Sequence, residues 1–344
     1  MLFVTPFVTL TYENTRGRSL QLGWETPYVI TAGNGQENHA NNVHGVPAPG
    51  RHGESETGSR MGTRHIRLVG EVRQGTGLSV EAMREALHMT FNPTLRGILT
   101  SENSQTGVRR WIQCTMEELP IVIAPTRGRP MTFEIMLVAL DPFWKGRPLT
   151  VNIAQTLKRW SYPMSIPQRG SALPDAMVFG IQHATLETRF MNMGNVESGF
   201  TAEIHARTGT VVNPSVVDME TGNQIRLNYT MARHDRIVIV NYLHEKRIEL
   251  NGENALHLLD AEATRFFLIQ VGQNRIGYFA DQNISNMQVR VRYTPEYTFV
   301  GGYDPQSMIR SPYIAENAWS GSVLENEETT RLINRLVPSG RREG

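Results

Sequence analysis

Regular alternation of apolar and polar residues, repeated in short runs along the chain, is the feature that most restricts its fold. In residues 65–72, Ile66 and Leu68 fall on one side, with polar residues between them. The same period of two recurs in residues 202–207 and 289–293. Because successive side chains of a strand point to opposite faces, this period indicates strands with one solvated face.

Other runs are apolar at nearly every position, and they indicate more deeply buried strands. These runs are residues 133–140, 237–240 and 266–271. Asn251-Gly252 supplies the pair of residues with positive φ that a tight hairpin favours. Strands at short spacing, separated by such turns, predict a mainly β fold, a sandwich or a barrel rather than a βαβ fold.

Two segments have helical periodicity. Residues 79–89 offer Ser79 as the N-cap and place Met83 and Leu87 on one side, so the N-terminal domain is expected to hold a single α-helix. Residues 325–337 begin with acidic and end with basic side chains, which suits the helix dipole. This second helix is predicted to dock on another surface through a narrow apolar stripe, formed by Leu332, Ile333, Leu336 and Val337.

Residues 31–63 interrupt the strand pattern. They are rich in Gly, Asn, His and Ser and contain no Phe, Trp or Tyr, so they cannot supply a core of their own. The segment is also far longer than the roughly 4–6 residues that usually join strands. We therefore expect a long loop, or arm, that reaches a neighbouring subunit.

Proline and glycine residues gather between 145 and 165, where we place a domain boundary. The expected organisation is an N-terminal domain over 1–148, a C-terminal domain over 149–300 and an extension over 301–344. Five residues of the N-terminal domain are predicted to be buried together, with Trp144 partly buried at the domain exit. They are Ile66, Leu68, Met83, Leu87 and Phe143.

The chain shows little sign of catalytic or metal chemistry. Cys114 is its only cysteine, so no intramolecular disulfide or Cys-based zinc site can form, and we interpret Cys114 as a small buried residue. His39, His44 and His52 lie close together, but their spacing matches no ligand pattern and favours a solvated polar loop. No nucleophile elbow or phosphate-binding loop is present. We predict no catalytic residue, no metal and no cofactor.

The charge distribution also limits the possible partners. The formal net charge is +1, without the basic excess typical of proteins that bind nucleic acid through phosphates. The pairs Arg109-Arg110 and Arg341-Arg342 are interpreted as solvated surface. No segment approaches the ~20 apolar residues of a membrane helix, and the first residues read as a strand rather than a signal peptide. We expect neither sequence-specific nucleic-acid binding nor a membrane partner.

One string favours a particular family. An apolar strand over 137–140 runs directly into Asp141-Pro142-Phe143-Trp144, where Asp-Pro ends the strand and the aromatic pair anchors the chain's exit under the sheet edge. This string resembles the end of the N-terminal domain of siphophage distal tail proteins. The resemblance covers roughly residues 1–300. It continues, in order, at Asn192-Met193-Gly194-Asn195 and over 202–206, 225–227, 235–241, 248–252, 266–276 and 289–293.

The resemblance implies two β-sandwich-like domains: a ring-forming N-terminal domain with a single α-helix and a galectin-like C-terminal domain. Family members form a hexameric ring at the tip of the tail tube, and DNA passes through its lumen. The implied partners are further copies of the chain, the tail tube protein, the tail-tip, lysin or hub protein, and receptor-binding proteins or side fibres. The implied location is the virion tail tip, after assembly in the host cytoplasm.

Two other functions are weighed beside this structural role. A glycan-binding module would need an exposed aromatic residue beside polar side chains. The candidates are Trp160 with Tyr162 and Tyr229 with Asn228, although hydrophobic packing is the preferred interpretation of each. A glycan hydrolase would need paired carboxylates, and nothing in the sequence brings two of them together. The structural, non-enzymatic role is the main prediction.

Overall fold

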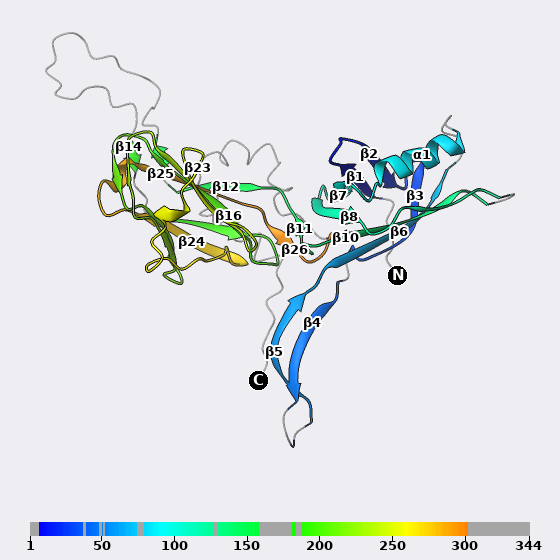
Figure 1. Ribbon diagram of the computed structural model, residues 1–344, viewed down its shortest axis with the longest axis horizontal. Helices are drawn as coiled ribbons and strands as arrows, with labels where there is room; N and C mark the ends of the chain where they lie inside the picture. The colour runs from blue at the N-terminus through cyan, green and yellow to red at the C-terminus, as the bar shows by residue number, and fades with distance from the viewer. Residues whose placement is uncertain are drawn as a thin grey trace, which may run out of the picture. The chain divides into compact units, whose positions relative to one another are not determined.

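The computed structural model describes most of the chain, and Figure 1 shows its elements. The described residues are 7–36, 39–47, 50, 52–73, 79–126, 129–153, 155–157, 181–183 and 187–301. They divide into two compact units. The first holds the described residues up to Arg147 and those from Pro295 to 301, and the second holds those from 148 to 294. The chain therefore leaves the first unit and later returns to it.

The first unit is built on one ten-stranded sheet, in the order β26-β11-β8-β7-β1-β2-β3-β6-β10-β9. Its strands are β1 (Val8–Asn14), β2 (Ser19–Gly23), β3 (Tyr28–Asn34), β6 (Arg64–Val72), β7 (Arg96–Asn103), β8 (Arg109–Met116), β9 (Ile121–Ile123), β10 (Thr132–Ala139), β11 (Trp144–Lys145) and β26 (Glu296–Tyr297). β10 also pairs with β8, through Leu137 opposite Met116, so the sheet closes on itself. The mainly β fold is confirmed, and the layers expected of a sandwich are here parts of one continuous sheet.

Helix α1 (Val80–Thr90) is the α-helix of this unit among its described residues. As predicted, Ser79 caps it, and the Ser79 side chain accepts a hydrogen bond from the Ala82 amide. The helix ends at Phe91, whose ring stacks on Tyr12 with centroids 4.5 Å apart. Its buried face therefore joins the interior of the closed sheet.

The predicted N-terminal core is correct for four of its five residues, because Ile66, Leu68, Met83 and Leu87 belong to one buried cluster. The fifth was wrong, since Phe143 is half-buried and lies outside that cluster. Trp144, expected to be partly buried, has an exposed fraction of 0%. The reason is local: β11 begins at Trp144, so strand alternation turns Trp144 inward.

The second unit contains two main sheets that share one apolar core. The larger has the order β12-β25-β16-β21-β22-β23, and the smaller has the order β15-β24-β18-β19. Their strands are β12 (Leu149–Asn152), β15 (Glu187–Asn192), β16 (Phe200–Ala206), β18 (Ser215–Asp218), β19 (Gln224–Arg226), β21 (Arg236–Asn241), β22 (Lys246–Leu250), β23 (Glu253–Asn254), β24 (Gly272–Phe279) and β25 (Met287–Tyr293). Short pairs are formed by β13 (Gln155–Leu157) with β14 (Ile181–His183) and by β17 (Val211–Val212) with β20 (Thr230–Met231). The 3-10 turns are η1 (Leu256–Leu258) and η2 (Ile284–Asn286).

Local predictions for the second unit have mixed outcomes. Asn251 and Gly252 both have positive φ, 53° and 92°, and form the predicted hairpin turn between β22 and β23. The strand predicted over 266–271 was wrong, since that segment makes one isolated bridge, Ser198 with Ile269. Its predicted burial is correct for Phe267 and Ile269, whereas Phe266 and Val271 are exposed. Apolar composition alone could not reveal that no neighbouring strand pairs along its length.

Residues 31–63 are not a plain loop. After β3 ends at Asn34, their described part contains β4 (Asn41–Pro47) and β5 (Glu54–Met61), which pair antiparallel as a separate two-stranded ribbon (Figure 1). We call this β4–β5 ribbon the arm. The predicted helix over 325–337 and nearly all of the predicted extension over 301–344 lie outside the described residues.

Candidate assembly site

The arm exposes both of its faces. Every residue of β4 is exposed, as is every residue of β5 except Met61, which is half-buried. Val43 and Val46 have exposed fractions of 61% and 54%. The ribbon is held by backbone pairing and by small contacts, such as the Thr57 hydroxyl, which donates to the His44 carbonyl at 3.0 Å. An isolated two-stranded hairpin is at best marginally stable in water. The exposed surface of the arm is therefore suited to contact with a partner.

The base of the arm, in contrast, is fixed by the closed sheet. β3 and β6 pair from Tyr28 opposite Val72 to Asn34 opposite Arg67, and the arm follows directly from their ends. Gly35 then turns the chain with φ of 83°, and a Cβ there would lie 1.8 Å from the His65 carbonyl oxygen. Glycine is therefore required at this turn for both its conformation and its size.

Arg64 lies beneath this turn, and its guanidinium is fully buried. Its Nη1 donates to the carbonyls of Gly35 and Gln36, at 2.7 and 3.1 Å. Its Nε donates to the Pro142 carbonyl and its Nη2 to the Thr298 carbonyl, both at 2.6 Å. Burial lowers the pKa of Arg64 to about 10. Backbone carbonyl dipoles, rather than a carboxylate, compensate its charge among the described residues.

Trp144 completes this buried contact set, because its indole Nε1 donates to the Gln36 carbonyl at 3.0 Å. We call the set formed by Arg64, Trp144, Gly35, Gln36 and the Pro142 carbonyl the arm root. Two of the four motif residues thus belong to the arm root: Pro142 through its carbonyl and Trp144 through its indole. Asp141 instead pairs with Lys145 at 2.9 Å and accepts a hydrogen bond from the Phe143 amide at 3.3 Å.

Residues 295–301, which we call the return segment, lie against the same region. β26 pairs with β11, with Glu296 opposite Lys145 and Tyr297 opposite Trp144. The side chain of Glu296 has an exposed fraction of 14%, and its carboxylate lies 3.9 Å from the Lys145 amine. Burial raises the pKa of Glu296 to about 7, while Lys145 lowers it and Asp141 raises it further.

Arg110 anchors the return segment from β8. Its Nη1 donates to the carbonyls of Phe299 and Gly301, at 2.7 and 2.5 Å, and its guanidinium lies 3.6 Å from the centroid of the Tyr297 ring. The interpretation of Arg110 as solvated surface was therefore wrong, since its exposed fraction is 3%. Its neighbour Arg109 is exposed as expected.

The position of each arginine in the alternating pattern of its own strand identifies it as buried. Arg64 has the same parity as Ile66 and Leu68, and Arg110 has the same parity as Ile112 and Cys114. A charged residue on the apolar side of an alternating strand must find buried partners, because its unpaired charge would be costly there. The sequence patterns contained this signal for β6, but not the identity of the carbonyls that Arg64 reaches.

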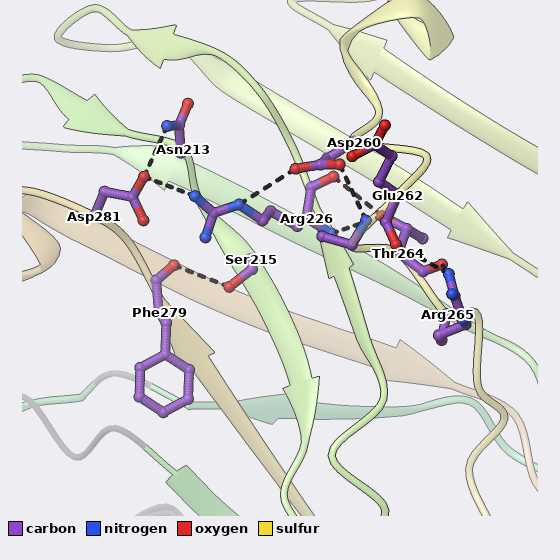
Figure 2. A network of polar contacts seen from close by, with 10 residues as sticks. Asn213, Ser215, Arg226, Asp260, Glu262, Thr264, Arg265, Phe279 and Asp281 are labelled. Atoms are coloured by element: carbon purple, nitrogen blue, oxygen red, sulfur yellow. Dashed lines mark hydrogen bonds and ion pairs between the residues drawn. The ribbon is translucent and has the colours of Figure 1, made fainter.

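In the second unit, a polar network surrounds Arg226 (Figure 2). Arg226 Nη2 lies 2.7 Å from the Asp281 carboxylate and its Nε lies 3.6 Å from Asp260. Asn213 Nδ2 donates to the same Asp281 carboxylate at 2.8 Å, and these two donors lower the pKa of Asp281, Asn213 first. The Arg226 amide also donates to the Thr264 hydroxyl at 3.1 Å. Each charge has a partner, so the network joins loops of the sandwich.

Of the predicted glycan-contact residues, the structure describes Asn228 and Tyr229. Tyr229 packs partly buried against the core, and its hydroxyl donates to Asp235 at 3.3 Å. Asn228 is exposed, and its backbone amide donates to the Leu258 carbonyl. Trp160 and Tyr162 lie outside the described residues. A glycan-binding role for these residues stays a prediction.

The remaining sequence predictions concern metals, the cysteine and the membrane. His39 Nε2 lies 2.9 Å from the Gly62 carbonyl, and His44 and His52 are exposed. Within the described ranges, no three His, Cys, Asp or Glu side chains are grouped so that they could hold a metal ion. Cys114 is buried, as predicted, and burial raises its pKa to about 12. None of the helices in the described part of the chain is long and apolar enough to cross a membrane.

Comparison with known proteins agrees with the resemblance seen in the sequence. Residues 193–297 match the family model described as siphovirus-type tail component, C-terminal domain. The fold is similar to a crystal structure of the SPP1 Dit (gp 19.1) protein, described as a paradigm of hub adsorption apparatus in phages that infect Gram-positive bacteria. The TM-score is 0.57 at 12% identity, over 83% of this chain and 98% of that one.

A chain of the phage P2 baseplate, in its activated conformation with Ca, covers 85% of this chain and 99% of its own length. The TM-score of this comparison is 0.44 at 11% identity. No curated protein matches the chain. The family match and the shared fold confirm the predicted resemblance to a distal tail protein.

Proposed function

We propose that this chain, whose second unit carries a siphovirus-type tail component domain, is the distal tail subunit of a long-tailed phage. Six copies would form a ring at the tip of the tail tube and leave a channel for DNA. One side of the ring would meet the tail tube protein. The other would meet the tail-tip, lysin or hub protein and any receptor-binding protein or side fibre. The role is structural and has no catalytic step.

The arm is the observation that carries this proposal. It is a paired ribbon with no buried face in the described structure, yet its base is fixed by the β3–β6 pair. A subunit with a projecting element and a different receiving surface makes a head-to-tail contact, which closes into a ring when the rotation permits. In the proposed ring, the arm of each subunit clasps the next.

Three groups with large pKa shifts support a structural rather than a catalytic role. Arg64 holds backbone carbonyls, Cys114 is buried in the core, and Glu296 lies in the β11–β26 pair. Perturbed groups gather at catalytic centres when they face a cleft, but these three are used in packing.

The test is to shorten the arm without disturbing its root. Residues 43–59 are replaced by Asn-Gly, a two-residue turn that joins the paired residues Asn42 and Arg60. Native mass measurement should find hexamers of the wild-type chain, alone or with its tail partners. The shortened chain should keep the same unfolding transition and fail to form rings.

Arg292→Ala is a matched control, because Arg292 is an exposed residue of β25 in the second unit. This variant should assemble as the wild type does. The proposal fails if the shortened chain forms rings of unchanged stability. A chain that stays monomeric with every tail partner and binds host glycan would instead support the glycan-binding alternative.

A further inference from the structure

The return segment and the arm are far apart in sequence but meet at one side chain. Arg64 is separated from Thr298 by 234 positions, and its Nη2 donates to the Thr298 carbonyl. The same guanidinium holds the carbonyls of Gly35 and Gln36, where the chain enters the arm. A planar guanidinium with donors in a fixed fork cannot move away from one acceptor without turning away from the others.

Trp144 provides a second connection between the same two segments. Its indole donates to the Gln36 carbonyl at the arm root. Its backbone belongs to β11, where it lies opposite Tyr297 of β26. Displacement of β26 would therefore uncover both residues that hold the arm entry.

Loss of the return segment would have an energetic consequence at Arg64. The site is fully buried, and Arg64 forms no ion pair with a carboxylate among the described residues. Once uncovered, the guanidinium would lose the Thr298 acceptor, and water would compete with the Gly35 and Gln36 carbonyls for its donors. Its hold on the turn that directs the arm would therefore weaken.

We propose that Arg64, assisted by Trp144, is a positioning residue that couples the direction of the arm to docking of the return segment. The arm is held in one direction when residues 295–301 lie against the first unit, and it becomes free to swing when they leave. A subunit would thus present a directed arm once the chain beyond its second unit has folded back. The coupling is intramolecular, and it holds whether or not the chain forms rings.

The experiment weakens the return segment at a point that does not contact the arm. Arg110→Ala removes the two hydrogen bonds to Phe299 and Gly301 and leaves Arg64 in place. Because hydrogen bonds to a charged donor are among the stronger ones, amide exchange of residues 296–301 should become at least about tenfold faster. This exchange measures release of the return segment in the full-length chain.

Arm direction is measured separately, by the distance between two spin labels. Ser55→Cys in the arm and Gln21→Cys in β2 place labels on exposed positions, while the buried Cys114 stays unlabelled. Labelled chains are diluted into unlabelled ones so that each distance lies within one molecule. Arg110→Ala should change a narrow distance distribution into a broad one, and Arg64→Gln should do the same directly.

The double variant decides whether Arg64 transmits the effect. With Arg64→Gln present, Arg110→Ala should add little further broadening, because the connection is already lost. Arg64→Lys, which keeps the charge but not the fork, serves if Arg64→Gln does not fold. Arg67→Ala is the control, since Arg67 is an exposed residue of the same strand and pairs with Glu134. A released return segment with an unchanged arm distribution would overturn the proposal.

Discussion

The arm and the β16–β25 pair of the second unit have the same backbone arrangement but opposite surroundings. Each joins seven residues of one strand to seven of another in antiparallel register. In β16–β25 every second side chain is buried, including Ile204 and Val289 at 0% exposure. In β4–β5 no side chain is buried. Pairing alone therefore shapes a ribbon, and burial decides whether that ribbon belongs to its own core.

The largest expected difference in unfolding free energy is between truncating a side chain in β16 and truncating one in the arm. Ile204→Ala removes a fully buried side chain and should lower the free energy of unfolding by about 2–5 kcal/mol. Val43→Ala in the arm should change it by less than about 0.5 kcal/mol. Chemical denaturation of both variants checks the comparison. Equal losses would mean that the arm side chain is buried in the free chain.

In its burial, the return segment lies between the arm and the β16–β25 pair. Its stability should depend on pH through Glu296. Burial raises the pKa of Glu296 from an ordinary 4.5 to about 7. The charge of Lys145 lowers this pKa, and that of Asp141 raises it. The folded state therefore binds this proton more tightly than the unfolded state. The stabilisation is complete below about pH 4.5 and is lost as pH rises through 7.

Glu296→Gln removes this titration, so the direction of the pH dependence can be tested. The free energy of unfolding of the variant, relative to wild type, should increase by about 2–3 kcal/mol between pH 4.5 and pH 8. Denaturation curves at several pH values measure it. Glu13→Gln, at an exposed position of β1, is the matched control for removal of a carboxylate. A flat difference for Glu296→Gln would show that its carboxylate is solvated.

The sequence could predict elements whose burial is one-sided. A period of two identified β6, β16 and β25, and Ser79 marked the start of α1, because these signals are local. The arm escaped prediction as a ribbon because a strand exposed on both faces has no reason to alternate. Composition still indicated an arm, since a segment without large apolar residues cannot form a core.

The arm root could be predicted only in part. The string Asp141-Pro142-Phe143-Trp144 indicated an anchored exit, but it could not tell that Trp144 turns inward while Phe143 does not. Arg64 reaches Thr298 through the fold and not through any sequence spacing. Closure of the sheet through β8 and β10 is likewise a long-range pairing that no local pattern contains.

A moderate loss of unfolding free energy is expected at Gly35, where the exposed arm joins the closed sheet. Gly35→Ala places a side chain at φ of 83°, with its Cβ 1.8 Å from the His65 carbonyl oxygen. The turn must shift, which should cost about 1–3 kcal/mol in unfolding free energy. Gly50→Ala is the control, because Gly50 has a similar φ of 74° and an added Cβ would meet no atom of the described residues within 4 Å. If the two variants lose the same unfolding free energy, contact of the added Cβ with His65 of β6 adds nothing to the cost of the positive φ.

The smallest effect on folding, and the most informative for assembly, should come from Val43→Thr combined with Val46→Thr. Threonine keeps the β-branched shape that suits a strand, and both positions are exposed in the chain described here. The free energy of unfolding should therefore change by less than about 0.5 kcal/mol. In the proposed ring these valines would be covered by the next subunit, and each added hydroxyl would need a partner there.

A buried hydroxyl without a hydrogen bond costs about 1–3 kcal/mol, and the ring repeats each substitution in every subunit. Rings of the double variant should accordingly dissociate at higher protein concentration than wild-type rings, as measured by native mass across a dilution series. Leu243→Thr, at an exposed turn of the second unit, tests whether loss of any exposed apolar side chain has this effect. Weakened rings for both variants would mean that the arm has no special role. Weakened rings for the arm variant alone would place its valines at the contact between subunits.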